Sequence, residues 1–139
     1  MIIKLNEKIV KIQIFDTGGL EDFQEIRRTY YKGAIGAFLV YDITRKETFI
    51  HVTKWLEEIK SNISEQITII LIGNKRDLEN KREVSYKEGE TFAKKNGLIF
   101  LEISAKIPNN IVEVFKIQFS PKFLMLKKIM KMILILKLN

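Results

Sequence analysis

Three short polar segments are the places in this sequence where residue types and spacing could do chemistry. They occupy residues 16–19 (Asp-Thr-Gly-Gly), 74–77 (Asn-Lys-Arg-Asp) and 104–106 (Ser-Ala-Lys), and each follows a predicted strand. Taken singly, each segment is better explained as a turn or an ordinary loop, because short motifs have poor specificity. Ligands of parallel sheets, however, bind beyond the carboxyl ends of the strands. Three such segments in this order therefore predict a ligand-binding edge.

The elements before these segments have the patterns of strands. Apolar residues alternate with polar ones over residues 3–5 and 10–14, and the two-residue connection Asn6-Glu7 between them predicts an antiparallel hairpin. Continuous apolar runs follow at residues 36–41, 67–72 and 98–101. Runs of this kind are typical of strands that are buried on both faces of a parallel sheet.

Helical patterns separate the runs. Apolar residues recur at helical spacing from Phe49 to Ile59, and Ser85 with Glu88 forms a capping box that opens a helix ending near Gly97. Strands that alternate with helices predict an α/β, doubly wound, mostly parallel sheet with an antiparallel edge hairpin. We expect one domain over residues 1–119 and an atypical basic, apolar tail over residues 120–139.

Composition excludes several classes of protein. The 139 residues contain no Cys, which excludes disulfides, a thiolate zinc site, a cysteine nucleophile and a prenyl anchor. The net charge of +7 comes mainly from six lysines after Glu113, because the residues up to Glu113 carry 18 basic and 17 acidic groups. Nucleic acid is therefore not an expected partner. No signal peptide or membrane-spanning run is predicted.

The segments together resemble the Ras superfamily of small GTPases, and the Rab branch most closely. Residues 12–23 resemble the family's W-D-T-A-G-Q-E-x-F, residues 30–34 its Y-Y-R-G-A, residues 40–44 its V-Y-D-I-T, residues 74–77 its N-K-x-D and residues 102–106 its E-T-S-A-K. The resemblance implies a P-loop NTPase small G-domain. It also implies a switch that binds GTP or GDP with Mg²⁺ in vesicle-mediated, intracellular protein transport.

The resemblance gives the base-reading role to Asp77. Its carboxylate would accept hydrogen bonds from the guanine N1–H and exocyclic amine, a pattern that adenine does not offer. Lys75 would lay its aliphatic stem along the base, and the Ala105 amide would donate to the guanine O6. The loops would be held by Asn74, Ser104 and Lys106. The alternative for Asp77 and Asn74 is that they cap turns.

The phosphate side departs from the family. None of the seven glycines is followed by Lys, so the G-x-x-x-x-G-K-[ST] P-loop is absent, and the chain begins about where the family's second strand begins. Of the metal-side residues only Asp16 remains, which in the family contacts Mg²⁺ chiefly through water, while the Gly19 amide could still approach a γ-phosphate. Leu20 stands where the family has its water-positioning Gln. We therefore expect weak nucleotide and Mg²⁺ binding, impaired hydrolysis and no assignable catalytic residue.

Two functions follow from this comparison. The first is a Rab-like small GTPase, and the second is a non-enzymatic pseudo-GTPase remnant that binds proteins. In either, effectors or regulators would dock on residues 20–31 through Phe23, Ile26, Tyr30 and Tyr31, unless these side chains merely pack on the sheet. The expected location is cytoplasmic, with peripheral contact to endomembranes only through the tail and without prenylation.

The tail could also supply a strand to the predicted sheet. In the family the first strand lies between the strands at residues 10–15 and 36–41, so its loss leaves a slot there. We expect this slot to stay open or to close by direct pairing. Residues 132–138 are the less favoured filler, because Lys127, Lys128 and Lys131 suit a membrane-surface helix better than a core. A frame shift or a mis-predicted exon at the gene ends is the simpler explanation of the tail.

Overall fold

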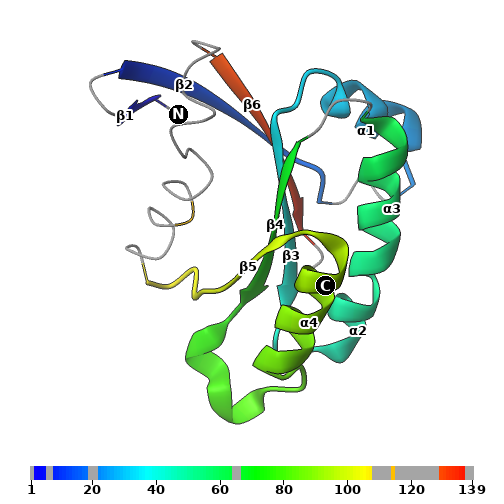
Figure 1. The fold of residues 1–139 in the computed structure, drawn as a ribbon, viewed down its shortest axis with the longest axis vertical. Helices are drawn as coiled ribbons and strands as arrows, with labels where there is room; N and C mark the ends of the chain where they lie inside the picture. The colour runs from blue at the N-terminus through cyan, green and yellow to red at the C-terminus, as the bar shows by residue number, and fades with distance from the viewer. Residues whose placement is uncertain are drawn as a thin grey trace.

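Six strands of the described residues form one sheet. The computed structural model describes residues 2–5, 8–18, 22–63, 67–107, 114 and 129–136. In chain order the strands are β1 (Ile2–Leu5), β2 (Lys8–Asp16), β3 (Gly36–Asp42), β4 (Thr68–Asn74), β5 (Ile99–Glu102) and β6 (Ile129–Leu136). Their order in space is β1-β2-β6-β3-β4-β5, and only β1 runs antiparallel to its neighbour (Figure 1). The α/β class with an antiparallel edge hairpin is therefore confirmed.

Strand β6 occupies the slot between β2 and β3. It pairs in parallel with β2 from Lys11↔Ile129 to Asp16↔Leu134, and with β3 from Gly36↔Met132 to Val40↔Leu136. The expectation of an open slot or of direct pairing between β2 and β3 is therefore wrong, and the less favoured filler is the correct one. A central strand satisfies two rows of backbone groups that would otherwise lack partners. Residues 129–136 are apolar except for Lys131, whereas Lys127 and Lys128 precede the strand.

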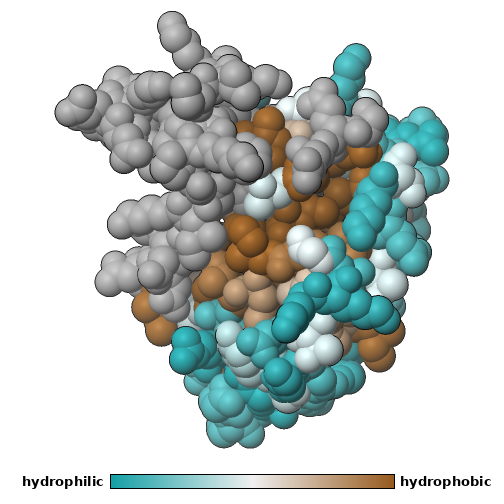
Figure 2. Space-filling model, in the orientation of Figure 1, coloured by the Kyte–Doolittle hydropathy of each residue, from teal (hydrophilic) through white to brown (hydrophobic). Residues whose placement is uncertain are grey.

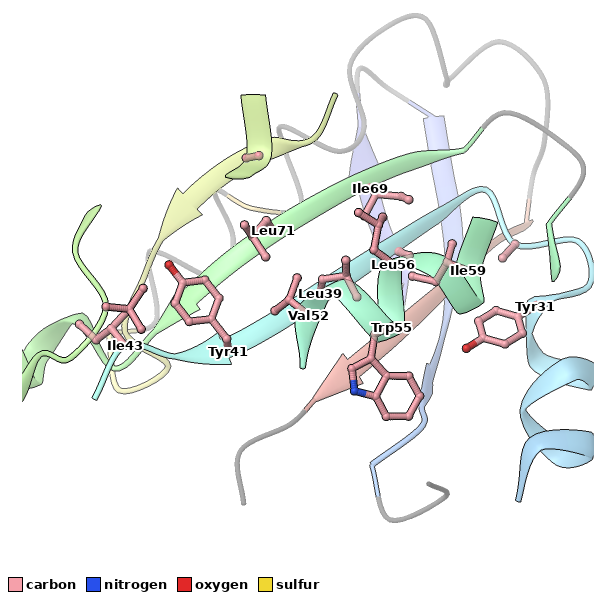
Figure 3. Close-up of a cluster of buried hydrophobic side chains, with 14 residues drawn as sticks. Tyr31, Leu39, Tyr41, Ile43, Val52, Trp55, Leu56, Ile59, Ile69 and Leu71 are labelled. Atoms are coloured by element: carbon pink, nitrogen blue, oxygen red, sulfur yellow. The ribbon is translucent and has the colours of Figure 1, made fainter. Parts of the chain in front are cut away.

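The described helices pack on one face of the sheet (Figure 1). They are α1 (Gln24–Tyr31), α2 (Lys46–Ile50), α3 (Val52–Asn62) and α4 (Tyr86–Asn96). The 3₁₀ segment η1 (Arg76–Lys81) lies in the connection that follows β4 and has no buried residues. Figure 3 shows how Leu39 and Tyr41 of β3 and Leu71 of β4 meet Trp55 and Leu56 of α3 in the main hydrophobic core. Among the described helices, none is long and apolar enough to cross a membrane.

The opposite face of the sheet is also apolar and buried at its centre. Alternate residues of β3 and β4, which point away from the helices just described, are fully or nearly fully buried: Phe38, Val40, Ile70 and Ile72. Burial on both faces explains why these strands read as continuous apolar runs rather than as alternating ones. In β2, Ile12 is buried as the alternating pattern predicts, whereas Ile14, on the same face of the strand, is 39% exposed, so burial of this face does not extend to Ile14.

Helix α4 begins and ends as predicted. The Ser85 hydroxyl accepts a hydrogen bond from the Glu88 amide at 3.2 Å, and the Glu88 carboxylate accepts one from the Ser85 amide at 2.8 Å. Gly97 follows the helix with a φ of 69°, in the left-handed conformation that glycine adopts without steric cost. The chain continues from α4 into β5, which is followed by the third polar segment at residues 104–106.

Candidate functional site

The loops after β4 and β5 lie side by side and are joined through their backbones. The Ile103 amide donates to the Gly73 carbonyl at 2.8 Å, and the Arg76 amide donates to the Ile103 carbonyl at 3.0 Å. These bonds continue the pairing of β4 with β5 beyond the ends of the strands. The sheet thus fixes the separation of the two segments that sequence analysis predicts to read a base.

Side chains of the two loops also bind one another. The Asn74 side-chain oxygen accepts the Ala105 amide at 3.1 Å, and the Ser104 hydroxyl donates to Asp77 Oδ1 at 2.6 Å. The Lys106 amide donates in turn to the Ser104 hydroxyl at 3.2 Å. Asn74 and Ser104 are buried, so these bonds are shielded from water. The bonds of Asn74 and of Asp77 run between the loops rather than closing a local turn, which is the arrangement that a shared binding edge requires.

The Asp77 carboxylate is charged and has capacity for further donors. The Ser104 hydroxyl, together with the Lys106 ammonium 3.7 Å away, holds the pKa of the Asp77 carboxyl below its usual range. An ionised carboxylate offers about four acceptor positions, and Ser104 uses one of them. The side chain of Asp77 is 25% exposed, so two donors on one edge of a flat ligand can still reach it.

Lys75 and Asp42 form an ion pair beside these loops. The Lys75 ammonium lies 2.6 Å from Asp42 Oδ2, and the Asp42 side chain is completely buried. Burial would raise the pKa of Asp42, but hydrogen bonds from Lys75 and Thr44 outweigh it and hold the pKa below its ordinary value. Sequence analysis did not select Asp42 for the site. A carboxylate at the carboxyl end of a buried apolar run, matching the D of V-Y-D-I-T, was the available signal.

Asp16 stands apart from the loops at residues 74–77 and 104–106, which are called the base-reading loops after the role predicted for them. It ends β2, and both β6 and β3 lie between it and β4, a separation of three strand spacings or about 14 Å. Its Oδ1 accepts the Gly18 amide at 2.9 Å. The predicted residues Gly19 and Leu20 lie outside the described residues.

The described residues do not fit a magnesium site. Among them, no three His, Asp or Glu side chains gather closely enough to hold a metal ion. Mg²⁺ is usually bound by one or two carboxylates with several waters and the substrate phosphates. Asp16 supplies one exposed carboxylate, and Gly18 already engages it.

A comparison with protein-family models identifies the chain. The model described as Ras family matches residues 1–120. The chain belongs to the Ras family. The match confirms the resemblance to small GTPases and to their guanine-nucleotide-binding switch, and it includes both base-reading loops. It ends before β6, so the strand that completes the sheet of this Ras-family chain comes from outside the matched region.

The segment of this Ras-family chain predicted to bind proteins has two exposed and two packed side chains. Phe23 and Ile26 are 54% and 45% exposed. Tyr31 is buried and its hydroxyl donates to the Glu58 carboxylate at 2.7 Å, while the Tyr30 ring packs 5.1 Å from the Phe15 ring. Of these four side chains, Phe23 and Ile26 are therefore the two that are well exposed to a partner.

An apolar cavity lies away from the base-reading loops. It has a volume of about 230 Å³ and is lined by residues of α3, the amino end of β4 and the end of α4: Ile59, Lys60, Ile63, Ile67, Ile69, Asn96, Gly97 and Leu98. Figure 2 shows apolar side chains reaching the surface across the middle of one face of the molecule. Because the cavity opens at the amino end of β4, it is separate from the edge where Asp77 lies.

Proposed function

We propose that this chain is a Rab-like guanine-nucleotide-binding protein of vesicle-mediated transport, in which base recognition is kept and GTP hydrolysis is impaired. The observation that carries the proposal is the hydrogen-bonded pairing of the two loops, in which Ser104 orients the Asp77 carboxylate and Asn74 orients the Ala105 amide. One loop thereby presents a negative acceptor. The other loop holds a backbone donor, the Ala105 amide, whose hydrogen is bonded to Asn74 and passes to the base when the base binds. GTP and GDP are the ligands that these groups suit.

Each group has one role in reading guanine. The Asp77 carboxylate accepts the N1–H and the exocyclic amine of the base, while the Ala105 amide exchanges its bond to Asn74 for one to O6. The stem of Lys75 covers one face of the ring. Adenine presents an acceptor at N1 and a donor at C6, so it would place an acceptor against the Asp77 carboxylate and a donor against the Ala105 amide. Such mismatched polar groups cost more than missing contacts, which is the source of selectivity.

Hydrolysis is not supported by the residues of this chain. Leu20 has no group that could orient an attacking water, and the sequence has no P-loop lysine to hold the β- and γ-phosphates. Binding and exchange of partners, rather than turnover, are the activities we propose. The location we propose is cytoplasmic. Peripheral contact with endomembranes is not proposed, because residues 129–136 of the tail form the central strand β6.

Equilibrium dialysis against guanosine and adenosine tests base recognition without the phosphates. The wild-type chain should retain guanosine in preference to adenosine, and Asp77→Ala should abolish that preference. Glu90→Ala is the matched control, because Glu90 is an exposed acidic residue on α4 that pairs with Lys87. Equal retention of the two nucleosides by the wild-type chain would contradict the proposal.

A protein-binding module without nucleotide dependence is the second candidate. The exposure of Phe23 and Ile26, which lie three residues apart at the start of α1, favours it, because neighbouring exposed apolar side chains can mark a protein-interaction site. A purified Rab effector or regulator that binds the wild-type chain would separate the two functions. Binding that is lost in Phe23→Ser with Ile26→Ser and kept in Asp77→Ala would favour the module. Binding that requires guanine nucleotide and an intact Asp77 would favour the switch.

A further inference from the structure

The Asp42 carboxylate is a buried acidic group beside the base-reading loops. Its Oδ1 accepts the Thr44 amide at 2.8 Å and the Thr44 hydroxyl at 2.6 Å, and its Oδ2 lies 2.6 Å from the Lys75 ammonium. The side chain has no exposed surface, whereas that of Lys75 is 39% exposed. The ammonium end of the partly exposed Lys75 side chain is thus held by the buried Asp42 carboxylate.

The backbone of Lys75 is held in an unusual conformation. With a φ of 68° and a ψ of 33°, Lys75 is the one non-glycine residue among those described that has a positive φ. Left-handed backbone is disfavoured for a residue such as Lys, which lacks the short polar side chain with which Asn or Asp stabilises it. The Leu78 amide donates to the Lys75 carbonyl at 2.8 Å, and the ion pair with Asp42 fixes the other end of the residue.

The position of Asp42 relative to Lys75 is set by the pairing of β3 with β4. Asp42 and Asn74 are register partners at the ends of β3 and β4, and the Ile43 amide donates to the Asn74 carbonyl at 3.1 Å. The Asp42 carboxylate is therefore fixed relative to Lys75 by neighbouring strands rather than by a flexible loop. Sites built on strands hold their side chains more closely than sites built on loops.

We propose that Asp42 is a positioning residue of the base-reading loop, which holds Lys75 with its aliphatic stem ready to cover the guanine ring. The inference rests on the proposed function and deepens it. A free lysine side chain would have to be immobilised when the base binds, and that ordering weakens binding. Because Asp42 orders Lys75 beforehand, β3, β4 and β5 preorganise the base half of the site without any contribution from a phosphate-binding segment.

A purely structural role for Asp42 is the competing explanation. The residue also ends β3, where its amide donates to the Thr48 hydroxyl at 2.9 Å. If Asp42 served only this turn, its replacement would lower stability without acting through Lys75. The two explanations differ in whether the effects of changing Asp42 and Lys75 on base binding depend on each other.

A double-mutant cycle on the full chain separates them, with guanosine as the probe and NMR titration as the readout. The variants are Asp42→Asn, Lys75→Met and their combination, since Met keeps an aliphatic stem but cannot form the ion pair. Each single variant should bind guanosine about 2- to 13-fold more weakly, the cost of immobilising one long side chain on binding. The combined variant should lose no more than either single variant. Thr48→Val is the control, which should lower the thermal midpoint and leave guanosine affinity unchanged.

Two results would overturn the inference. Independent, additive losses in the combined variant would show that Asp42 does not act through Lys75. An unchanged left-handed backbone at Lys75 in Asp42→Asn, read from its three-bond amide–Hα coupling and Cα shift, would show that the ion pair does not hold the loop. The coupling measurement needs no ligand. If the wild-type chain fails to prefer guanosine, the proposed function fails, and the backbone of Lys75 still decides whether Asp42 positions it.

Discussion

The Ser104 hydroxyl reaches 2.6 Å across from one loop to the Asp77 carboxylate of another, 27 residues away in the sequence. This bond is the main reason that the pKa of Asp77 lies below its ordinary value. Ser104→Ala should therefore raise the pKa of Asp77, and should weaken guanosine binding because the carboxylate loses its orientation. The carboxyl ¹³C shift of Asp77, followed as pH is lowered, measures the first effect. An unchanged titration in Ser104→Ala would remove Ser104 from the site.

Strand β6 should be essential for folding. Truncation after residue 128 would expose the facing backbone groups of β2 and β3, and each group left unsatisfied costs about 1–3 kcal/mol. Several such groups exceed the total stability of a small domain, about 5–15 kcal/mol. We expect the truncated chain to lose its cooperative unfolding transition in circular dichroism. Truncation after Leu136 keeps every strand pair and should unfold like the full chain; equal behaviour of the two truncations would contradict the sheet order.

The ion pair between Arg27 and Glu58 should fasten α1 to α3. Two guanidinium nitrogens lie 2.7 and 3.0 Å from the two carboxylate oxygens, and both side chains are largely buried. Glu58→Gln leaves the buried Arg27 charge without its partner and should cost about 3–5 kcal/mol of unfolding free energy. Chemical denaturation measures this loss. Glu57→Gln, the exposed neighbour on α3, should change stability by less than about 0.5 kcal/mol.

The same carboxylate predicts an acid-sensitive fold. Burial raises the pKa of Glu58, but hydrogen bonds from Arg27 and Tyr31 outweigh it, so the folded pKa lies below the ordinary value of 4.5. The stability that Glu58 contributes is therefore complete above about pH 4.5 and is lost as pH falls through the lower folded pKa. Thermal midpoints should decline below this pH in the wild-type chain and decline less steeply in Glu58→Gln. Parallel declines would contradict the assignment.

Guanine nucleotide should bind these 139 residues weakly despite the ordered base-reading loops. The absent P-loop would supply about four charge-assisted hydrogen bonds of about 1.5–3 kcal/mol each. Their loss costs about 6–12 kcal/mol, or about four to nine decades of affinity. Calorimetry should therefore show GDP binding in the high-micromolar range or weaker, with little gain over guanosine. Nanomolar binding of GDP would contradict this reasoning.

Local patterns in the sequence were enough to predict most of the fold and the placement of residues 74–77 and 104–106 after neighbouring strands. The strand at β2, the continuous runs of β3 and β4 and the Ser85–Glu88 capping box depend on neighbouring residues, and the structure confirms them. The position of β6 depends instead on which distant segment satisfies the backbone between β2 and β3. The cluster of Lys127, Lys128 and Lys131 made a central strand look unfavourable, although Lys127 and Lys128 precede β6.

The ion pair between Lys75 and Asp42 was also beyond prediction from local patterns. It joins residues 33 positions apart, and neither spacing nor composition relates them. Parallel pairing of β3 with β4 brings Asp42 level with Asn74, the residue before Lys75. The ion pair could have been predicted only from the register of β3 with β4. The exposure of Phe23 and Ile26, set against the burial of Tyr31, likewise follows from how α1 packs and not from its residue types.

Chemical-shift mapping with three nucleosides tests the central claim most directly. Titration of the ¹⁵N-labelled chain with guanosine should move the amide signals of Asn74, Lys75, Asp77, Ala105 and Lys106. Inosine lacks the exocyclic amine and so one bond to Asp77, worth about 1.5–3 kcal/mol, and should bind about 10- to 150-fold more weakly at the same residues. Adenosine should leave these signals in place. Equal shifts with adenosine, or guanosine shifts confined to other parts of the chain, would contradict a guanine-reading site at this edge of the sheet.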